Sequence, residues 1–259
     1  MQEHLRKNYN QEFDIFGYPQ KYKDLVLHPI LVKDISIQDL FYKVFARPKN
    51  YIPNVEILKT TYLKFLIYVL SETFGPNGTE VVEAIIDVLK YITKKEVEIL
   101  VRQKEGVGLD SVELQIKIDN FLFNENDFDN IREIVLEQNN LSIEYIESYN
   151  PELEVHLEFM NRNTADINFQ DQIFTFCAIM KIPLSEVEKY TLFQFGNLME
   201  KLLTLKEYDL YKPLLASGQI TLKSGEIKHF LYHSVKSGRY DSILMNKDAF
   251  MAENKDAFG

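Results

Sequence analysis

Hydrophobic residues recur every three to four positions along most of the chain, a spacing that predicts amphipathic helices. In the first half, this spacing predicts helices through residues 39–45 and 55–74 and a third that starts after Thr79, which can cap it. In the second half, it predicts helices over residues 127–136, 151–160, 169–180, 185–188, 192–205 and 227–233. Helices should therefore dominate the fold.

The hydrophobic spacing changes to two after the third predicted helix. Apolar positions alternate with charged or other positions over 97–101 and again over 112–118, which predicts a β-hairpin with Gly106 in its loop. An earlier run, 25–32, is rich in strand-forming residues. Pro29 cannot donate a hydrogen bond to a sheet, so this run should be an edge strand or contain a bulge.

These patterns predict a mainly α protein of the α+β class, with a helix-rich body and a small antiparallel sheet in the N-terminal half. We expect an N-terminal α+β domain over residues 1–123 and a C-terminal helical domain over residues 124–245. Residues 246–259 form a separate tail, because they contain the only internal repeat in the sequence.

The tail repeats the pentapeptide Asn-Lys-Asp-Ala-Phe at residues 246–250 and 254–258. Phe250, Met251 and Phe258 are the candidate partner-binding residues, since exposed aromatic side chains at a terminus need something to cover them. Helical spacing also allows these three side chains to pack back on the protein's own body. The tail therefore either folds back as a lid on the protein's own body or binds a partner through its two phenylalanines.

Composition narrows the classes of protein that fit the chain. Its 259 residues are 46% hydrophobic, enough to bury a sizeable core. A net charge of −10 argues against wide contact with nucleic acid, whose affinity comes largely from Lys and Arg. Nucleic-acid binding stays an alternative because basic residues and tyrosines interleave in the last third of the chain: Lys206, Lys212, Lys223, Lys228, Lys236 and Arg239 with Tyr208, Tyr211, Tyr232 and Tyr240.

Cysteine usage and hydropathy indicate a soluble protein of the cytoplasm. The single cysteine, Cys177, excludes an internal disulfide, and its apolar neighbours favour a buried small side chain over a reactive thiol. The first twenty residues lack the apolar segment of a signal peptide. The most apolar stretch, residues 62–70, is interrupted by Lys64 and is far shorter than the roughly 20 residues of a membrane helix.

No motif in the sequence predicts catalysis, a cofactor or a metal. His229 and His233 lie four residues apart with Glu226 nearby, but zinc normally takes three or four protein ligands and the motif is incomplete. The oxygen-rich residues 124–129 lack the glycine of a calcium loop and are better explained as a helix cap. A phosphate-binding glycine loop and a nucleophile elbow are also missing. We therefore expect a non-enzymatic protein.

Several short sequence segments of the chain resemble proteins from the tail-gene region of long-tailed bacteriophages of Gram-positive hosts. The similar segments span roughly residues 25 to 245. They are residues 29–34 leading to Leu40-Phe41, residues 126–139, residues 149–154, residues 190–195 and residues 217–220. None of them is a catalytic motif.

The resemblance implies a phage tail morphogenesis protein, most plausibly a tail assembly chaperone that holds the tape-measure protein or tail-tube subunits before they polymerise. An acidic, helix-rich body suits this role, because grooves between helices can accept amphipathic helices of a partner. The resemblance implies no catalytic residues. The alternatives are a structural subunit of the virion, in its tail or connector, a metal-binding protein built on Glu226, His229 and His233, and a nucleic-acid-binding protein.

Overall fold

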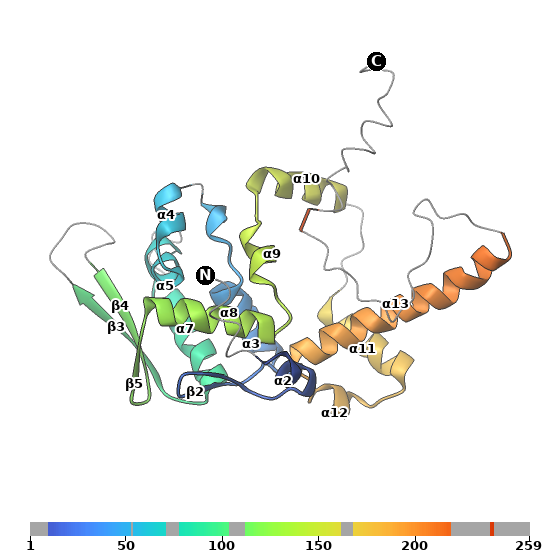
Figure 1. The fold of residues 1–259 in the computed structure, drawn as a ribbon, viewed down its shortest axis with the longest axis horizontal. Coiled ribbons are helices and arrows are strands. Elements are labelled where there is room, and N and C mark those ends of the chain that lie inside the picture. Colours follow the sequence, from blue (N-terminus) through green and yellow to red (C-terminus); the bar gives the residue numbers. More distant parts are fainter. Residues whose placement is uncertain are drawn as a thin grey trace, which may run out of the picture.

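A computed structural model describes residues 10–52, 54–70, 78–103, 112–161, 168–218 and 239–240. Figure 1 shows the N-terminal elements gathered at one end of an elongated molecule and α11 to α13 at the other. The elements are α2 (Gln11–Phe16), β1 (Gln20–Tyr22), β2 (Leu25–Leu27), α3 (Ile35–Phe45), the 3-10 helix η1 (Lys49–Tyr51), α4 (Val55–Lys59), α5 (Tyr62–Lys64), the π-helix η2 (Phe65–Leu70), α7 (Gly78–Thr93), β3 (Val97–Gln103), β4 (Val112–Ile118), β5 (Phe121–Asn124), α8 (Glu125–Gln138), α9 (Ile143–Glu147), α10 (Pro151–Asn161), α11 (Phe169–Met180), α12 (Leu184–Val187) and α13 (Leu192–Ala216).

The strands form two small antiparallel sheets in the N-terminal half. Strands β1 and β2 pair across a tight turn that places Lys23 at a positive φ of 51°. Strands β3, β4 and β5 form the second sheet in that order, with Val97 opposite Ile118 and Ile116 opposite Phe123. The helix-rich α+β class and the predicted hairpin are therefore confirmed.

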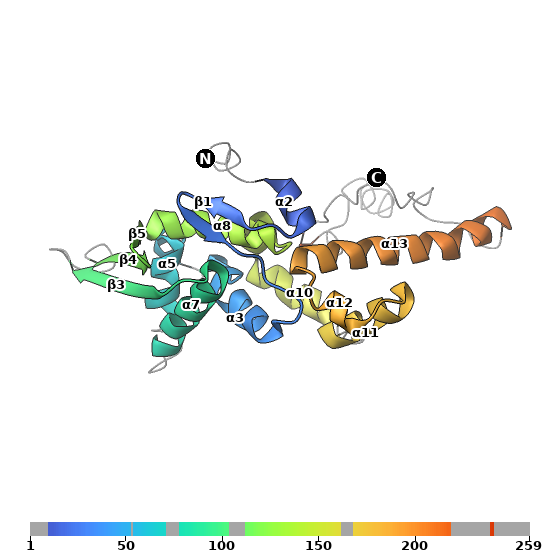
Figure 2. The ribbon, with the colours of Figure 1, turned by 90° about the horizontal axis from the view of Figure 1, so that it is seen from below.

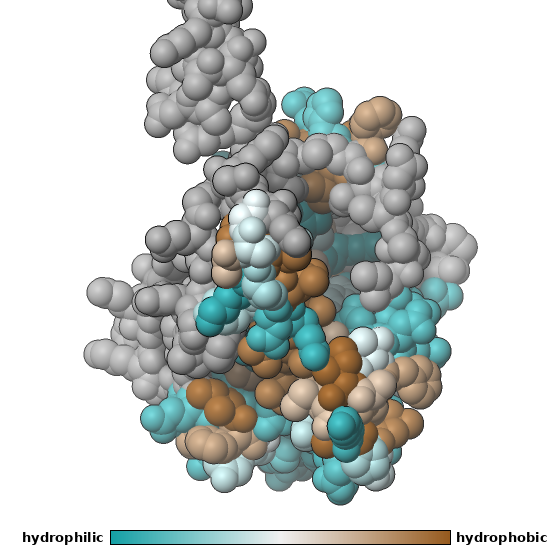
Figure 3. Space-filling view, turned by 90° about the vertical axis from the view of Figure 1, so that its right-hand side faces the viewer, coloured by the Kyte–Doolittle hydropathy of each residue, from teal (hydrophilic) through white to brown (hydrophobic). Residues whose placement is uncertain are grey.

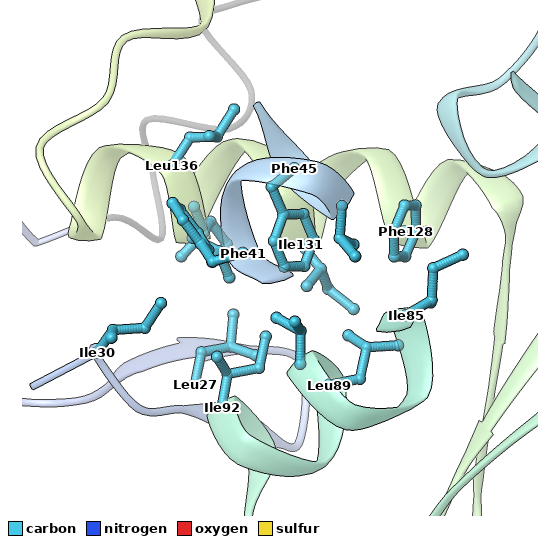
Figure 4. Packing of buried hydrophobic residues seen from close by; sticks show 14 of the residues in the cluster. Leu27, Ile30, Phe41, Phe45, Ile85, Leu89, Ile92, Phe128, Ile131 and Leu136 are labelled. Carbon is cyan, nitrogen blue, oxygen red and sulfur yellow. The ribbon is translucent and has the colours of Figure 1, made fainter. Parts of the chain in front are cut away.

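The core of the N-terminal half lies where α3, α7 and α8 meet over the β1–β2 sheet. Figure 4 shows Phe41 and Phe45 of α3 close to α8, with Ile85 and Leu89 of α7 on the other side of the cluster. The rings of Phe45 and Phe128 stack with their centroids 5.7 Å apart. All five side chains are fully buried. Burying each one contributes about 1.5–3 kcal/mol relative to leaving it exposed.

Helix α8 holds the segment that follows β2 in place. The Gln138 side chain donates to the Leu27 carbonyl at 3.0 Å, and the Asn139 side chain accepts from the Ile30 amide at 2.9 Å. This helix begins just after the expected boundary at residue 124, yet it packs on α3, α5, β1, β4 and β5. The division of the chain into domains 1–123 and 124–245 stays a prediction.

Helices α11 and α13 are joined by a cluster of aromatic rings. The Phe195 ring lies edge-on to the rings of Phe169 and Phe176, with both centroid distances at 5.4 Å. A short antiparallel bridge ties this cluster to the N-terminal half, because the Val32 amide donates to the Tyr190 carbonyl at 2.9 Å. Figure 2 shows α13 extending away from the body beyond this junction.

The prediction of one helix over residues 55–74 is wrong. The helix α4 ends before Thr60, and both Thr60 and Thr61 take extended backbone conformations. Side chains from elsewhere hold this break, since Lys49 donates to the Thr60 carbonyl at 2.5 Å and Thr61 donates to Glu125 at 2.6 Å. These tertiary hydrogen bonds override a local pattern that is helical throughout.

Other boundaries also differ from the predictions. The early strand is confined to Leu25–Leu27 and pairs with the unpredicted strand β1 rather than with the hairpin. The sequence pattern missed β5 as well. Helix α13 continues to Ala216, eleven residues past the predicted end at 205, and a glycine with a positive φ of 68° follows it at Gly218. The helix predicted over 227–233 and the hairpin loop around Gly106 lie outside the described residues.

Candidate partner-binding surface

Most residues that the sequence singled out as functional lie outside the described part of the chain. This holds for the candidate partner-binding residues Phe250, Met251 and Phe258, and for Glu226, His229 and His233. Among the described residues, no group of three or more His, Cys, Asp or Glu side chains is placed to hold a metal ion.

Two sequence interpretations fall within the described residues. The oxygen-rich run at 124–129 begins helix α8, where the Asn124 side chain accepts from the Asp127 amide at 2.9 Å and Asp127 accepts from the Asn124 amide at 3.0 Å. This reciprocal capping box confirms the helix-cap interpretation. Cys177 is a free, half-buried thiol on α11 that packs against the core.

The polar groups at the start of α8 serve the fold. Asp127 accepts hydrogen bonds from the Tyr22 hydroxyl and the Lys23 ammonium, each at 2.6 Å. Burial raises the pKa of Asp127, but these hydrogen bonds and the one from the Asn124 amide outweigh it, so the pKa lies below the ordinary value. Burial and the contact with Asp127 raise the pKa of Tyr22 to about 12. Both groups thus keep one protonation state near neutral pH.

A second polar cluster surrounds the buried Arg132. Its guanidinium lies 3.7 Å from the centre of the Tyr62 ring, and its Nε donates to the Phe45 carbonyl at 2.8 Å. The neighbouring Asp129 accepts from the Tyr62 amide at 3.0 Å, and burial raises the pKa of this carboxyl. These contacts pin α8 against the break in the predicted helix, which is a structural role.

A polar cavity of about 280 Å³ opens beside the N-terminus of α8, lined by Thr61, Lys64, Val112, Glu113, Leu114, Asn124, Glu125 and Asn126. Glu125 is the obvious candidate base, but both of its oxygens are engaged. One accepts from the Leu114 amide at 2.9 Å, and the other accepts from Thr61 and lies 3.6 Å from the Lys64 ammonium. This carboxylate, held by three donors, joins β4, α5 and α8, which is a structural role.

The feature that the core does not explain is the apolar surface of α13. Its first turns bury a regular stripe at Leu192, Phe195, Met199 and Leu202. Leu210 lies five full helical turns after Leu192 and Leu203 lies within about 20° of the same side, so both continue the side of the stripe, yet 58% and 59% of them is exposed. Because they are seven residues apart, the two leucines lie on the same side of the helix.

Exposed apolar side chains continue on the two preceding helices. We define the C-terminal apolar surface by the described residues of α11, α12 and α13 that are large, hydrophobic and exposed: Phe174, Ile179, Met180, Leu184, Leu198, Leu203 and Leu210. Figure 3 views this end of the molecule, where hydrophobic side chains, drawn brown, interrupt the hydrophilic surface. Exposed apolar surface of this kind is typical of sites that bind another protein.

The C-terminal apolar surface rests on a well-fixed platform. Thr191 and Gln194 form a reciprocal capping box at the start of α13, with hydrogen bonds of 3.1 and 2.9 Å. The Gln194 side chain also donates to the Ile15 carbonyl at 3.0 Å, which joins α13 to α2. The sequence pattern does not reveal this surface, because Leu203 and Leu210 continue the helical spacing of the buried stripe and that spacing predicts burial.

The described residues Arg239 and Tyr240 return to the start of α10, and we call this contact the clasp. The Arg239 Nε donates to Glu154, and the Tyr240 hydroxyl donates to the same Glu154 oxygen at 2.8 Å. The Asn150 amide donates to the Tyr240 hydroxyl, whose ring is only 6% exposed. The Arg239 hydrogen bond lowers the pKa of Glu154 below its usual range.

Helix lengths and hydropathy give one further finding. Among the helices in the described ranges, none is long and apolar enough to cross a membrane.

Comparison with known proteins finds a similarity in the segment of the C-terminal helices. A family model described as the YomV second domain matches residues 161–234, a segment that includes α11, α12 and α13. No curated protein and no solved structure matches the chain. YomV is encoded in a phage region of Bacillus, and the matched segment contains all seven residues of the C-terminal apolar surface. Over this segment the chain is therefore similar to a phage-encoded protein. This similarity is consistent with the chain itself being a phage protein.

Proposed function

We propose that the protein is a non-enzymatic phage tail morphogenesis protein that acts as a tail assembly chaperone. Its C-terminal apolar surface binds a helical segment of the tape-measure protein, or of tail-tube subunits, before these polymerise. The observation that carries the proposal is the exposure of Leu203 and Leu210 on α13, beyond Leu202, the last buried residue of the stripe that packs into the protein.

The chemistry of this surface fits an amphipathic helix as the partner. A helix binds through apolar residues spaced three, four and seven positions apart, and Leu203 and Leu210 offer the spacing of seven on α13. The protein's net charge of −10 keeps a complex with an aggregation-prone partner in solution. The family match supports a phage setting for this segment, and the proposed place of action is the cytoplasm of the host cell.

Co-expression tests the proposal. The chain is produced together with a tape-measure protein encoded in the same genome, and the soluble fraction is analysed by gel filtration. We expect more soluble tape-measure protein and a peak that contains both proteins. The matched control co-expresses a variant with Leu203→Gln and Leu210→Gln, which should give neither. Unchanged solubility together with separate peaks for the two wild-type proteins would contradict the proposal.

A second measurement separates a chaperone from a structural subunit. A chaperone leaves its partner on assembly, so purified virions should contain no more than traces of this protein. Stoichiometric amounts in the particle, measured by quantitative mass spectrometry, would assign the protein to the tail or connector instead.

A further inference from the structure

The clasp fixes one point of the C-terminal segment on the body of the protein. Arg239 and Tyr240 contact residues that lie about ninety positions earlier in the chain, at the start of α10. The Arg239 guanidinium also lies 5.1 Å from the ring centres of both Tyr145 and Tyr149. The contact is specific, because each of its interactions needs the partner in one orientation. These are the ion pair of Arg239, the buried hydroxyl of Tyr240 and the packing of the guanidinium on the two rings.

We infer that the clasp tethers the tail so that its first repeat, with Phe250, docks on the exposed face of α10 around Val155. Val155 follows Glu154 directly and is 65% exposed. Ten residues separate Phe250 from Tyr240, and an extended chain of that length spans at most about 36 Å. Helix α10, with 11 residues, is only about 16 Å long. Phe250 therefore reaches every position on α10 from the clasp.

The lysine of the tail repeat, but not the aspartate beside it, Asp248, has opposite charges available on α10. The sequence of α10 contains Glu152, Glu154 and Glu158 but no lysine or arginine. Each tail repeat places a lysine three residues before its phenylalanine, so Lys247 precedes Phe250. With Phe250 on Val155, the Lys247 ammonium can pair with a glutamate one helical turn away on α10. This occupant is the chain's own tail, and a tethered segment binds at a high effective concentration.

Disulfide trapping tests the inference in the full-length protein. Cys177→Ala removes the native thiol, and Glu152→Cys with Ala249→Cys places one thiol on α10 and one beside Phe250. In a redox buffer we expect an intramolecular disulfide, seen as a faster-migrating monomer on a non-reducing gel. It should form at least about tenfold faster than in the control pair Glu207→Cys with Ala249→Cys, whose first thiol lies on α13.

Two added changes show whether the clasp and the anchor are responsible. Adding Arg239→Ala with Tyr240→Ala, or adding Phe250→Ala alone, should lower the rate to that of the control pair. The Phe250 variant leaves every described contact in place, so it remains informative if the clasp variant folds poorly. Equal rates in the test and control pairs, or a rate that neither change lowers, would overturn the inference. A disulfide-linked dimer as the main product would also overturn it and would assign the α10 face to a second copy of the chain.

Discussion

Replacing two leucines on α13 tests the proposed binding surface most directly. The variant carries Leu203→Gln and Leu210→Gln, which remove apolar surface while keeping a similar intrinsic helix preference. Since both side chains are more than half exposed, the change should leave the fold intact. Substitutions at such surface positions typically alter the free energy of unfolding by no more than about 0.5 kcal/mol each.

The expected loss of affinity follows from the exposed fractions. Fully burying a leucine side chain contributes about 1.5–3 kcal/mol. With 58% and 59% of Leu203 and Leu210 exposed in the free protein, a partner that covers them gains about 1–2 kcal/mol from each. The double variant therefore loses about 3 kcal/mol, which corresponds to a dissociation constant about 100-fold higher.

Isothermal titration calorimetry with a soluble fragment of the tape-measure protein measures this loss. The matched control carries Leu58→Gln and Leu122→Gln, two leucines that are 45% and 50% exposed on α4 and β5, far from α13 in the chain. It should bind like the wild type. Equal weakening by both double variants, or a change of less than about threefold in the α13 variant, would refute the assignment of the partner to α13.

Three further predictions concern the contacts that hold the fold. Arg132→Met removes the buried guanidinium from Tyr62 and should lower the free energy of unfolding in urea by about 3–5 kcal/mol, whereas Arg102→Met on an exposed strand should change it by less than about 0.5 kcal/mol. Phe195→Ala opens the aromatic cluster of α11 and α13 and should cost about 3–5 kcal/mol by the same assay; a cost below about 1 kcal/mol would show that the cluster is not packed as described. Asp127 has a lowered pKa in the folded protein, so its stabilising contribution is present above the unfolded-state pKa near 3.8 and is lost as the pH falls through the folded-state pKa. The difference in the free energy of unfolding between wild type and Asp127→Asn should therefore narrow below about pH 4. A difference that widens on acidification would contradict the assigned hydrogen bonds.

The class of the fold could be predicted because periodicity reports which side chains face the core. The alternation over β3 and β4 identified the hairpin, and the capping residues near Asn124 marked the start of α8. The break at Thr60 and Thr61 could not be predicted in this way. Its causes are Lys49, which precedes Thr60 by 11 residues, and Glu125, which follows Thr61 by 64, and helical periodicity reports neither contact.

The candidate surface was harder to predict from the sequence than the fold. A leucine on a helix predicts burial, and only the packed arrangement shows that the buried stripe of α13 ends at Leu202 while Leu203 and Leu210 stay exposed. The clasp was equally hidden. Arg239 and Tyr240 suggested a basic, aromatic surface for nucleic acid, whereas the structure places both against Glu154 and Asn150.

The clasp has a consequence for how this part of the chain could have been acquired. Asn150 and Tyr240 lie within hydrogen-bonding distance, so the two ends of the segment between them adjoin. The segment that matches the YomV second domain lies entirely between these two residues. A segment with adjoining ends can be inserted, replaced or lost as one piece while the path of the preceding chain is kept. Such a geometry lets related genomes exchange the helices that carry the C-terminal apolar surface while they retain the α+β part of the chain.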